Sequence, residues 1–127
     1  MWVMCREGFF SVVCAREGDG GHGSRVDLDR VMVRARSRAH LEGLCEQFPE
    51  LVKYGVKTTE QTDYRHRIII PKGLWVRIAA GLANDIAYPN FKNEVAEVHG
   101  RGSSYDVALH SVWSVMLRLQ TSETRPR

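Results

Sequence analysis

The sequence lacks any apolar run approaching the roughly 20 residues that a helix needs to cross a bilayer. Its first residues, MWVMCREGFF, also lack the basic segment and the apolar stretch of a secretory signal. We therefore expect no membrane insertion and a cytoplasmic location. The composition, 43% apolar and 26% charged, is typical of an ordinary globular domain.

Cysteine is scarce, and its placement does not suggest a cross-linked framework. Cys5, Cys14 and Cys45 are odd in number, widely spaced and embedded in apolar pattern. We expect three buried, reduced thiols with a structural role. The close Cys and His pairs of structural zinc sites do not occur, so the sequence predicts neither a metal nor another cofactor.

Sequence motifs of common catalytic sites are also missing. The glycines at 18–23 lack the Gly-Lys-Ser/Thr ending of a nucleotide loop, so they favour a mobile hairpin connection over a phosphate cradle. Ser11 and Ser111 lack a Gly-x-Ser-x-Gly elbow. No motif in the sequence indicates a particular reaction.

Lysine is rare as well, since 14 of the 18 basic residues are arginine. The formal net charge of +3 is too small to indicate a nucleic-acid-binding protein. The planar fork of arginine pairs with carboxylates and phosphates, but a GC-rich genome gives the same bias. Arginine content alone therefore leaves both explanations open.

Hydrophobic periodicity predicts alternating strands and helices. We expect strands at 2–5, 9–14, 30–36 and 64–70, a helix after Ser37, and helices at 72–86, 91–98 and 104–120. The fold class is α+β, with a three- to four-stranded antiparallel or mixed sheet covered on one face by helices, in the order β-β-α-β-α-α-α. We expect one domain over 1–120 and a disordered polar tail over 121–127.

The last helix has the clearest signals. Ser103 and Asp106 resemble a capping box at its start. Its apolar stripe is expected to pack on the core and consists of Tyr105, Leu109, Val112, Trp113, Met116 and Leu119.

Five segments, GFFSVV, VRAR, TDYRHR, YPNFKNEVA and YDVALHSVWSVMLRLQ, extend over nearly the whole chain. Together they resemble a family of short bacterial α+β proteins with no assigned activity. YPNFK and the terminal VW helix are the most specific part of the resemblance. It implies a bacterial protein whose domain is complete at this length, and it implies nothing about substrate.

The strand at 30–36 carries Arg34 and Arg36 between its apolar residues, and the strand at 64–70 carries Arg65 and Arg67. If the two strands are neighbours, these four arginines lie close together on one sheet face. Either Asp63, Glu60 or another carboxylate then pairs with them, or the face binds an external anion. An ordinary solvated sheet face is the alternative.

Two further groups are weaker candidates. Asn90 is placed as a helix cap with Lys92 beside it, where backbone N–H groups can bind an anion, although a plain cap explains both residues. His99 and His110 with Lys92 could in principle act as acid and base on a phosphodiester, but their spacing does not support this.

These observations favour a small non-enzymatic binding or regulatory module. Its arginine-bearing sheet face would bind an acidic protein or a nucleic acid, and homo-oligomer formation is left open. One alternative is an inhibitor of the phage or mobile-element type that blocks a host enzyme. The other is a small hydrolase or nuclease that uses His99, His110 and Lys92.

Overall fold

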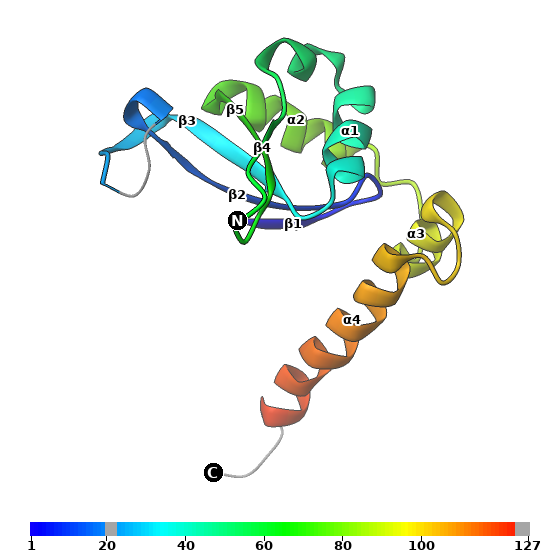
Figure 1. The fold of residues 1–127 in the computed structure, drawn as a ribbon. Coiled ribbons are helices and arrows are strands. Elements are labelled where there is room, and N and C mark those ends of the chain that lie inside the picture. Colours follow the sequence, from blue (N-terminus) through cyan, green and yellow to red (C-terminus); the bar gives the residue numbers. More distant parts are fainter. Residues whose placement is uncertain (20–22, 124–127) are drawn as a thin grey trace. The chain divides into compact units, whose positions relative to one another are not determined.

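The computed structural model describes residues 1–19 and 23–123 (Figure 1). The chain divides into two compact units, Met1–Ile86 and Ala87–Arg127. The first unit contains the sheet with the helices that pack on it, and the second contains two helices.

The sheet of the first unit has five strands, all paired antiparallel: β1 (Trp2–Met4), β2 (Phe9–Arg16), β3 (Val26–Ala35), β4 (Lys57–Thr58) and β5 (His66–Pro71). Their order across the sheet is β1-β2-β3-β5-β4. The α+β class is confirmed, but the predicted count of three to four strands is wrong. The uncounted strand is β4, whose two exposed polar residues carry no hydrophobic alternation.

The helices of this unit are the 3₁₀ segments η1 (Glu17–Asp19) and η2 (Pro49–Tyr54) and the α-helices α1 (Arg38–Gln47) and α2 (Lys72–Asn84). In Figure 1, α1 and α2 lie on the same side of the strands. Leu41 and Leu44 of α1 and Trp75 and Ile78 of α2 enter one core cluster with the sheet. The sheet residues of this cluster include Val31, Val33, Ala35, Ile68 and Ile70.

The element order also differs from the predicted β-β-α-β-α-α-α, because β4 and the two 3₁₀ segments are inserted. β3 begins at Val26, four residues before the predicted start, and the backbone N–H of Glu17 donates to the carbonyl of Arg25 at 2.8 Å. The β2–β3 pairing therefore extends further toward the glycine-rich connection than the apolar pattern indicates. Of that connection, residues 20–22 lie outside the described residues.

The second face of the sheet points away from α1 and α2. Because side chains alternate along a strand, the residues between the core positions of β2, β3 and β5 share this face. Ser11 lies directly opposite Arg34, and Arg34 directly opposite Arg67.

The second unit consists of α3 (Phe91–His99) and α4 (Ser104–Glu123). Asn90 caps α3 as predicted, since its Oδ1 accepts from the N–H of Asn93 at 3.0 Å. Ser103 Oγ accepts from the N–H of Asp106 at 3.3 Å, whereas Asp106 Oδ2 accepts from the N–H of Gly102 at 2.9 Å. In the predicted capping box the Asp106 carboxylate would accept from the N–H of Ser103, whereas in the structure it accepts from the N–H of the preceding residue, Gly102.

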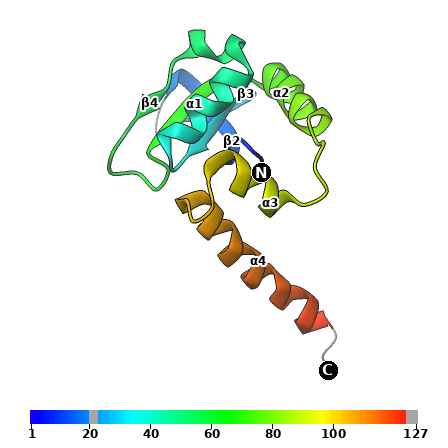
Figure 2. The same ribbon diagram turned by 90° about the vertical axis from the view of Figure 1, so that its right-hand side faces the viewer.

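Only the start of α4 is buried. Figure 2 shows α3 beside the first turns of α4 and the rest of α4 continuing past it. Tyr105 and Leu109 are buried, whereas Trp113, Met116 and Leu119 are exposed. The prediction that the whole stripe packs on a core is wrong, because α3 is too short to cover the later turns. α4 also continues through Glu123, into the segment predicted as a tail, and residues 124–127 lie outside the described residues.

The cysteines are free thiols, and only Cys5 is fully buried, whereas Cys14 and Cys45 are half-buried. The prediction that all three thiols are buried therefore holds for Cys5 alone. Among the residues that the structure describes, no helix has the length and apolar character needed to span a membrane.

Candidate functional site

Four arginines define the arginine face: Arg34, Arg36, Arg65 and Arg67. β3 and β5 are neighbours, and Arg34 pairs directly with Arg67 in their register. Arg36 and Arg65 each adjoin the last paired residues, Ala35 and His66, and lie just outside the paired part of the two strands. Directly opposite residues have Cβ atoms about 5 Å apart, so Arg34 and Arg67 are close neighbours, and Arg34 and Arg36 both lie over the ring of Tyr64.

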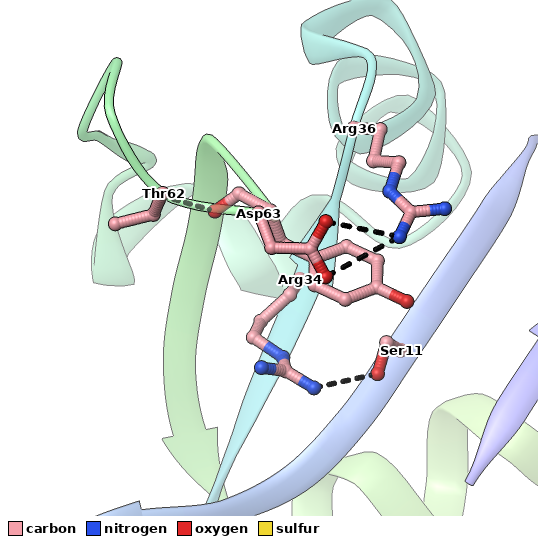
Figure 3. Close-up of polar contacts among 6 residues, drawn as sticks. Ser11, Arg34, Arg36, Thr62 and Asp63 are labelled. Atoms are coloured by element: carbon pink, nitrogen blue, oxygen red, sulfur yellow. Dashed lines mark hydrogen bonds and ion pairs between the residues drawn. The ribbon is translucent and has the colours of Figure 1, made fainter. Parts of the chain in front are cut away.

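Arg34 is held by neutral partners. Its Nη2 donates to Ser11 Oγ at 2.7 Å, as Figure 3 shows, and its guanidinium carbon lies 4.6 Å from the centre of the Tyr64 ring. Its Nε is buried and has no hydrogen-bond partner among the described residues. A hydroxyl and an aromatic ring orient the guanidinium without cancelling its charge.

Arg36 has a carboxylate partner. Its Nη2 donates to both carboxylate oxygens of Asp63, at 3.1 and 3.3 Å (Figure 3). Its guanidinium carbon also lies 4.4 Å from the centre of the Tyr64 ring. The two side chains are 55% and 77% exposed, and a pair so exposed stabilises the fold by only about 0–1 kcal/mol. An external anion can therefore displace Asp63 at little cost.

The β5 arginines complete the site. Arg67 Nη1 donates to Thr59 Oγ1 at 2.9 Å, which is again a neutral partner. Arg65 is exposed, and no ion pair to it is found within the described residues. The same holds for Glu60, which the sequence offered as a partner.

Positive charge therefore exceeds negative charge on the arginine face. Among the described residues Asp63 is the one carboxylate that pairs with these four arginines. Lys57 of β4 lies opposite Arg67 in the strand register. The arrangement can form several charge-assisted hydrogen bonds with carboxylates or phosphates of another molecule.

Apolar side chains continue the same sheet face next to the arginines. Trp2 is paired with Ser11 and is 69% exposed, and its ring meets the ring of Phe9 edge to face at 5.6 Å between centres. Phe9 in turn lies 6.3 Å from Tyr64. Sequence reasoning missed this part of the site, although the alternation of WVM and FFSVV contained the signal.

The second predicted site, at Asn90 and Lys92, has a different arrangement. Asn90 serves as the cap of α3, and Lys92 Nζ lies 4.5 Å from the centre of the Trp113 ring in α4. Both residues thus have structural contacts that explain them without a bound anion.

Lys92, His99 and His110 have separate partners. His99 packs edge to face on Tyr105 at 5.1 Å, and His110 Nε2 lies 3.4 Å from Asp106 Oδ1. Lys92 and His99 stand at opposite ends of α3, about 10 Å apart along the axis at 1.5 Å per residue. These positions do not bring the three side chains to one reacting atom.

A hollow of about 540 Å³ lies between α1 and η2, on the other side of the sheet. Its lining includes Arg38, Glu42 and Cys45, and Arg38 Nε donates to Glu42 at 2.9 Å. Burial, helped by Glu42, raises the pKa of the Cys45 thiol, which disfavours the nucleophilic thiolate. Within residues 1–19 and 23–123, no cluster of His, Cys, Asp or Glu is suited to hold a metal ion.

No family model, curated protein or solved structure matches the chain. The resemblance to short bacterial proteins stays a prediction.

Proposed function

We propose that the protein is a non-enzymatic binding module whose arginine face holds an acidic surface of another protein. The observation that carries this proposal is that Arg34 and Arg67 are held by hydroxyl groups and Arg65 is exposed, so their charges are oriented but not cancelled. Arg34 and Arg67 are direct cross-strand neighbours whose like charges repel one another, and an anionic partner relieves that repulsion.

The neighbouring side chains favour a protein partner over a nucleic acid. The arginines adjoin Trp2, Phe9, Met4 and Met32 on the same sheet face. Aromatic residues, methionine and arginine are the types enriched in the cores of protein interfaces, where lysine and glutamate are depleted. A nucleic acid requires mainly phosphate contacts, and the net charge of +3 provides few beyond this face.

Other observations support the accompanying expectations. Three free thiols are typical of a reducing compartment, which supports a cytoplasmic location. The separation of Lys92, His99 and His110 gives the hydrolase alternative no support. The inhibitor alternative needs an apolar surface beside acidic residues, and the sheet face instead places its apolar residues beside arginines.

The experiment titrates two labelled probes with the full chain, an acidic peptide of repeated glutamate and a single-stranded DNA oligonucleotide, at low and at moderate salt. The test variant replaces Arg65 and Arg67 with glutamine, which leaves the Ser11–Arg34 and Arg36–Asp63 contacts in place. The control variant changes Lys72 and Arg77 of α2 to glutamine, which removes the same charge from exposed positions outside the arginine face.

We expect the acidic peptide to bind more tightly than the oligonucleotide at moderate salt. The test variant should lose about tenfold or more in affinity, since each charge-assisted hydrogen bond contributes about 1.5–3 kcal/mol. The control should bind nearly as the parent does. Preferential binding of the oligonucleotide would show that the partner is a nucleic acid and not a protein. An equal loss of affinity in both variants would show that the arginine face is not the binding site.

A further inference from the structure

One row of side chains crosses the five strands on the side of the sheet that carries the arginine face. The strand register places Ser11 opposite both Trp2 and Arg34. It places Arg67 opposite both Arg34 and Lys57. All five residues belong to Met1–Ile86, so the row lies within one compact unit.

The row changes from apolar to cationic along its length. Trp2, at the β1 end, is 69% exposed, and its ring meets the ring of Phe9 edge to face. Ser11 comes next and is buried, so it adds no large side chain to the surface. The guanidinium groups of Arg34 and Arg67 follow, and both donate to hydroxyl groups. A ligand that contacts both ends of the row must therefore cross the strands.

The distance between strands sets the spacing that such a ligand must match. Strands lie about 4.8 Å apart, which places Arg34 about 10 Å and Arg67 about 14 Å from Trp2 across the sheet. On one face of an α-helix, residues seven and eleven positions apart are separated by about 10 and 16 Å along the axis. Arginine side chains are long enough to absorb a difference of about 2 Å.

An extended chain matches the row less well. It rises about 3.3 Å per residue and its side chains alternate between two faces, so neighbours on one face are about 6.6 Å apart. That step is longer than the distance between strands, whereas residues three and four apart on a helix are about 5–6 Å apart. The row thus favours a helix over a strand.

We propose that the arginine face binds an acidic amphipathic helix of its partner, laid across the strands. An apolar side chain of this helix packs against Trp2 and Phe9. Carboxylates seven and eleven residues further along bind Arg34 and Arg67. This inference rests on the proposed function, since it requires an acidic protein partner, and it adds the shape of the segment that binds.

The two ends of the row contribute different parts of the recognition. The contact of Arg36 with both oxygens of Asp63 shows how a guanidinium group of this face takes a carboxylate. Attraction between charges alone leaves the position of an acidic segment undefined, because neighbouring carboxylates are interchangeable. The exposed ring of Trp2 fixes that position, since an apolar side chain gains free energy by burial at that end only.

Two peptides of identical composition test the inference. Both have a helix-forming sequence of alanine and glutamine with one leucine, and the first has glutamates seven and eleven positions after the leucine. The second has them five and nine positions after it, which turns the carboxylates by about 160° around the helix axis. In an extended chain both peptides keep their two glutamates four positions apart on one face, so only a helical ligand distinguishes them.

Fluorescence anisotropy of the labelled peptides, titrated with the full chain, measures the two affinities. The first peptide should bind about tenfold or more tightly than the second, because the second cannot contact Trp2 and both arginines together. Its helical circular-dichroism signal should rise on binding.

Two substitutions of exposed apolar residues give a matched comparison. Trp2→Ala should remove most of the difference between the peptides, because the apolar anchor is lost. Val76→Ala changes a residue of α2 that is 59% exposed and lies outside the arginine face, and it should leave both affinities as in the parent chain. The peptide comparison with the parent chain depends on neither variant.

Equal affinities of the parent chain for the two peptides would overturn the helical inference, and so would a difference that persists in full in Trp2→Ala. The proposed function fails on another result, which is unchanged binding of the repeated-glutamate peptide when Arg65 and Arg67 are replaced with glutamine. An acidic partner bound in extended form would give equal affinities here and a loss in that variant, so the two proposals fail separately.

Discussion

Individual arginines of the same face have different environments. Arg36 has a carboxylate partner, whereas Arg34 and Arg67 donate to hydroxyl groups. A hydroxyl partner fixes the direction of a guanidinium and leaves its full charge for another molecule. Ser11 is 2% exposed, so the Arg34 hydrogen bond is also shielded from water at one end. These two arginines are thus presented in a defined orientation.

The first prediction concerns the thiol of Cys5. Burial, together with the nearby charge of Glu7, raises the pKa of this thiol to about 11, and the group donates to the carbonyl of Gly8 at 3.5 Å. A raised thiol pKa means that the reactive thiolate is scarce in the folded protein until the pH approaches that value. Iodoacetamide at pH 8 should modify Cys14 and Cys45 well before Cys5, as followed by peptide mass spectrometry.

Modification in denaturant is the control, and there all three cysteines should react at similar rates. Early modification of Cys5 in the native protein would show that its environment is open.

The second prediction concerns the close approach of Gly8 to α1. A Cβ placed on Gly8 would overlap the ring of His40, whose Nδ1 accepts from the N–H of Phe9 at 3.2 Å. The ring is therefore held in place and cannot move aside cheaply. Gly8→Ala should destabilise the fold by about 1–3 kcal/mol in urea unfolding.

Gly43 in α1 provides the comparison, because a Cβ there would meet its nearest atom at 3.6 Å, an ordinary contact distance. Gly43→Ala should stabilise by up to about 1 kcal/mol through helix propensity. A change in the free energy of unfolding in the same direction for both substitutions would contradict the close approach of Gly8 to His40.

Single residues were predictable where their role is local. Asn90 caps α3 as expected, because a cap depends on the next three residues and on little else. Lys92 was interpreted as part of an anion site, but its ammonium lies over Trp113, which is 21 positions later in the sequence. No local pattern contains that contact.

At the scale of elements, α4 shows that an amphipathic pattern does not by itself determine which residues are buried. Its stripe has regular helical spacing, yet the part beyond Leu109 is exposed. Periodicity predicts which side chains share a face, whereas the length of the neighbouring helix decides which of them are covered. The short strand β4 shows the converse, since pairing with β5 defines it and its own two residues do not.

The third prediction compares two positions on α4. Leu109 is 5% exposed and Trp113 is 53% exposed. Leu109→Ala should cost about 2–5 kcal/mol as a core truncation. Trp113→Ala should cost about 0.5–1 kcal/mol, mainly through the lost contact with Lys92.

Thermal unfolding followed by circular dichroism measures both variants. A larger loss for Trp113→Ala than for Leu109→Ala would mean that the first turns of α4 are not its anchored part.

At the scale of the whole molecule, the chain consists of two compact units. The main hydrophobic core cluster, from Cys5 to Ile78, lies entirely within Met1–Ile86. The arginine face belongs to the same unit. Fold stability and the proposed binding activity are therefore expected from one part of the chain.

The fourth prediction follows from this division. A fragment of residues 1–86 should fold cooperatively and keep most of the acidic-peptide affinity, because it retains the core and all four arginines. Urea unfolding and peptide titration of the fragment provide the measurements. A fragment that folds but no longer binds would show that residues after 86 contribute to the site.

The most direct test of the arginine face is amide chemical-shift mapping of the full chain as the acidic glutamate peptide is added. The account predicts that the largest shifts cluster on β3 and β5 around Arg34, Arg36, Arg65 and Arg67, and that they disappear in the variant with glutamine at 65 and 67. Shifts centred on Asn90 and Lys92, or shifts that persist in that variant, would contradict the account.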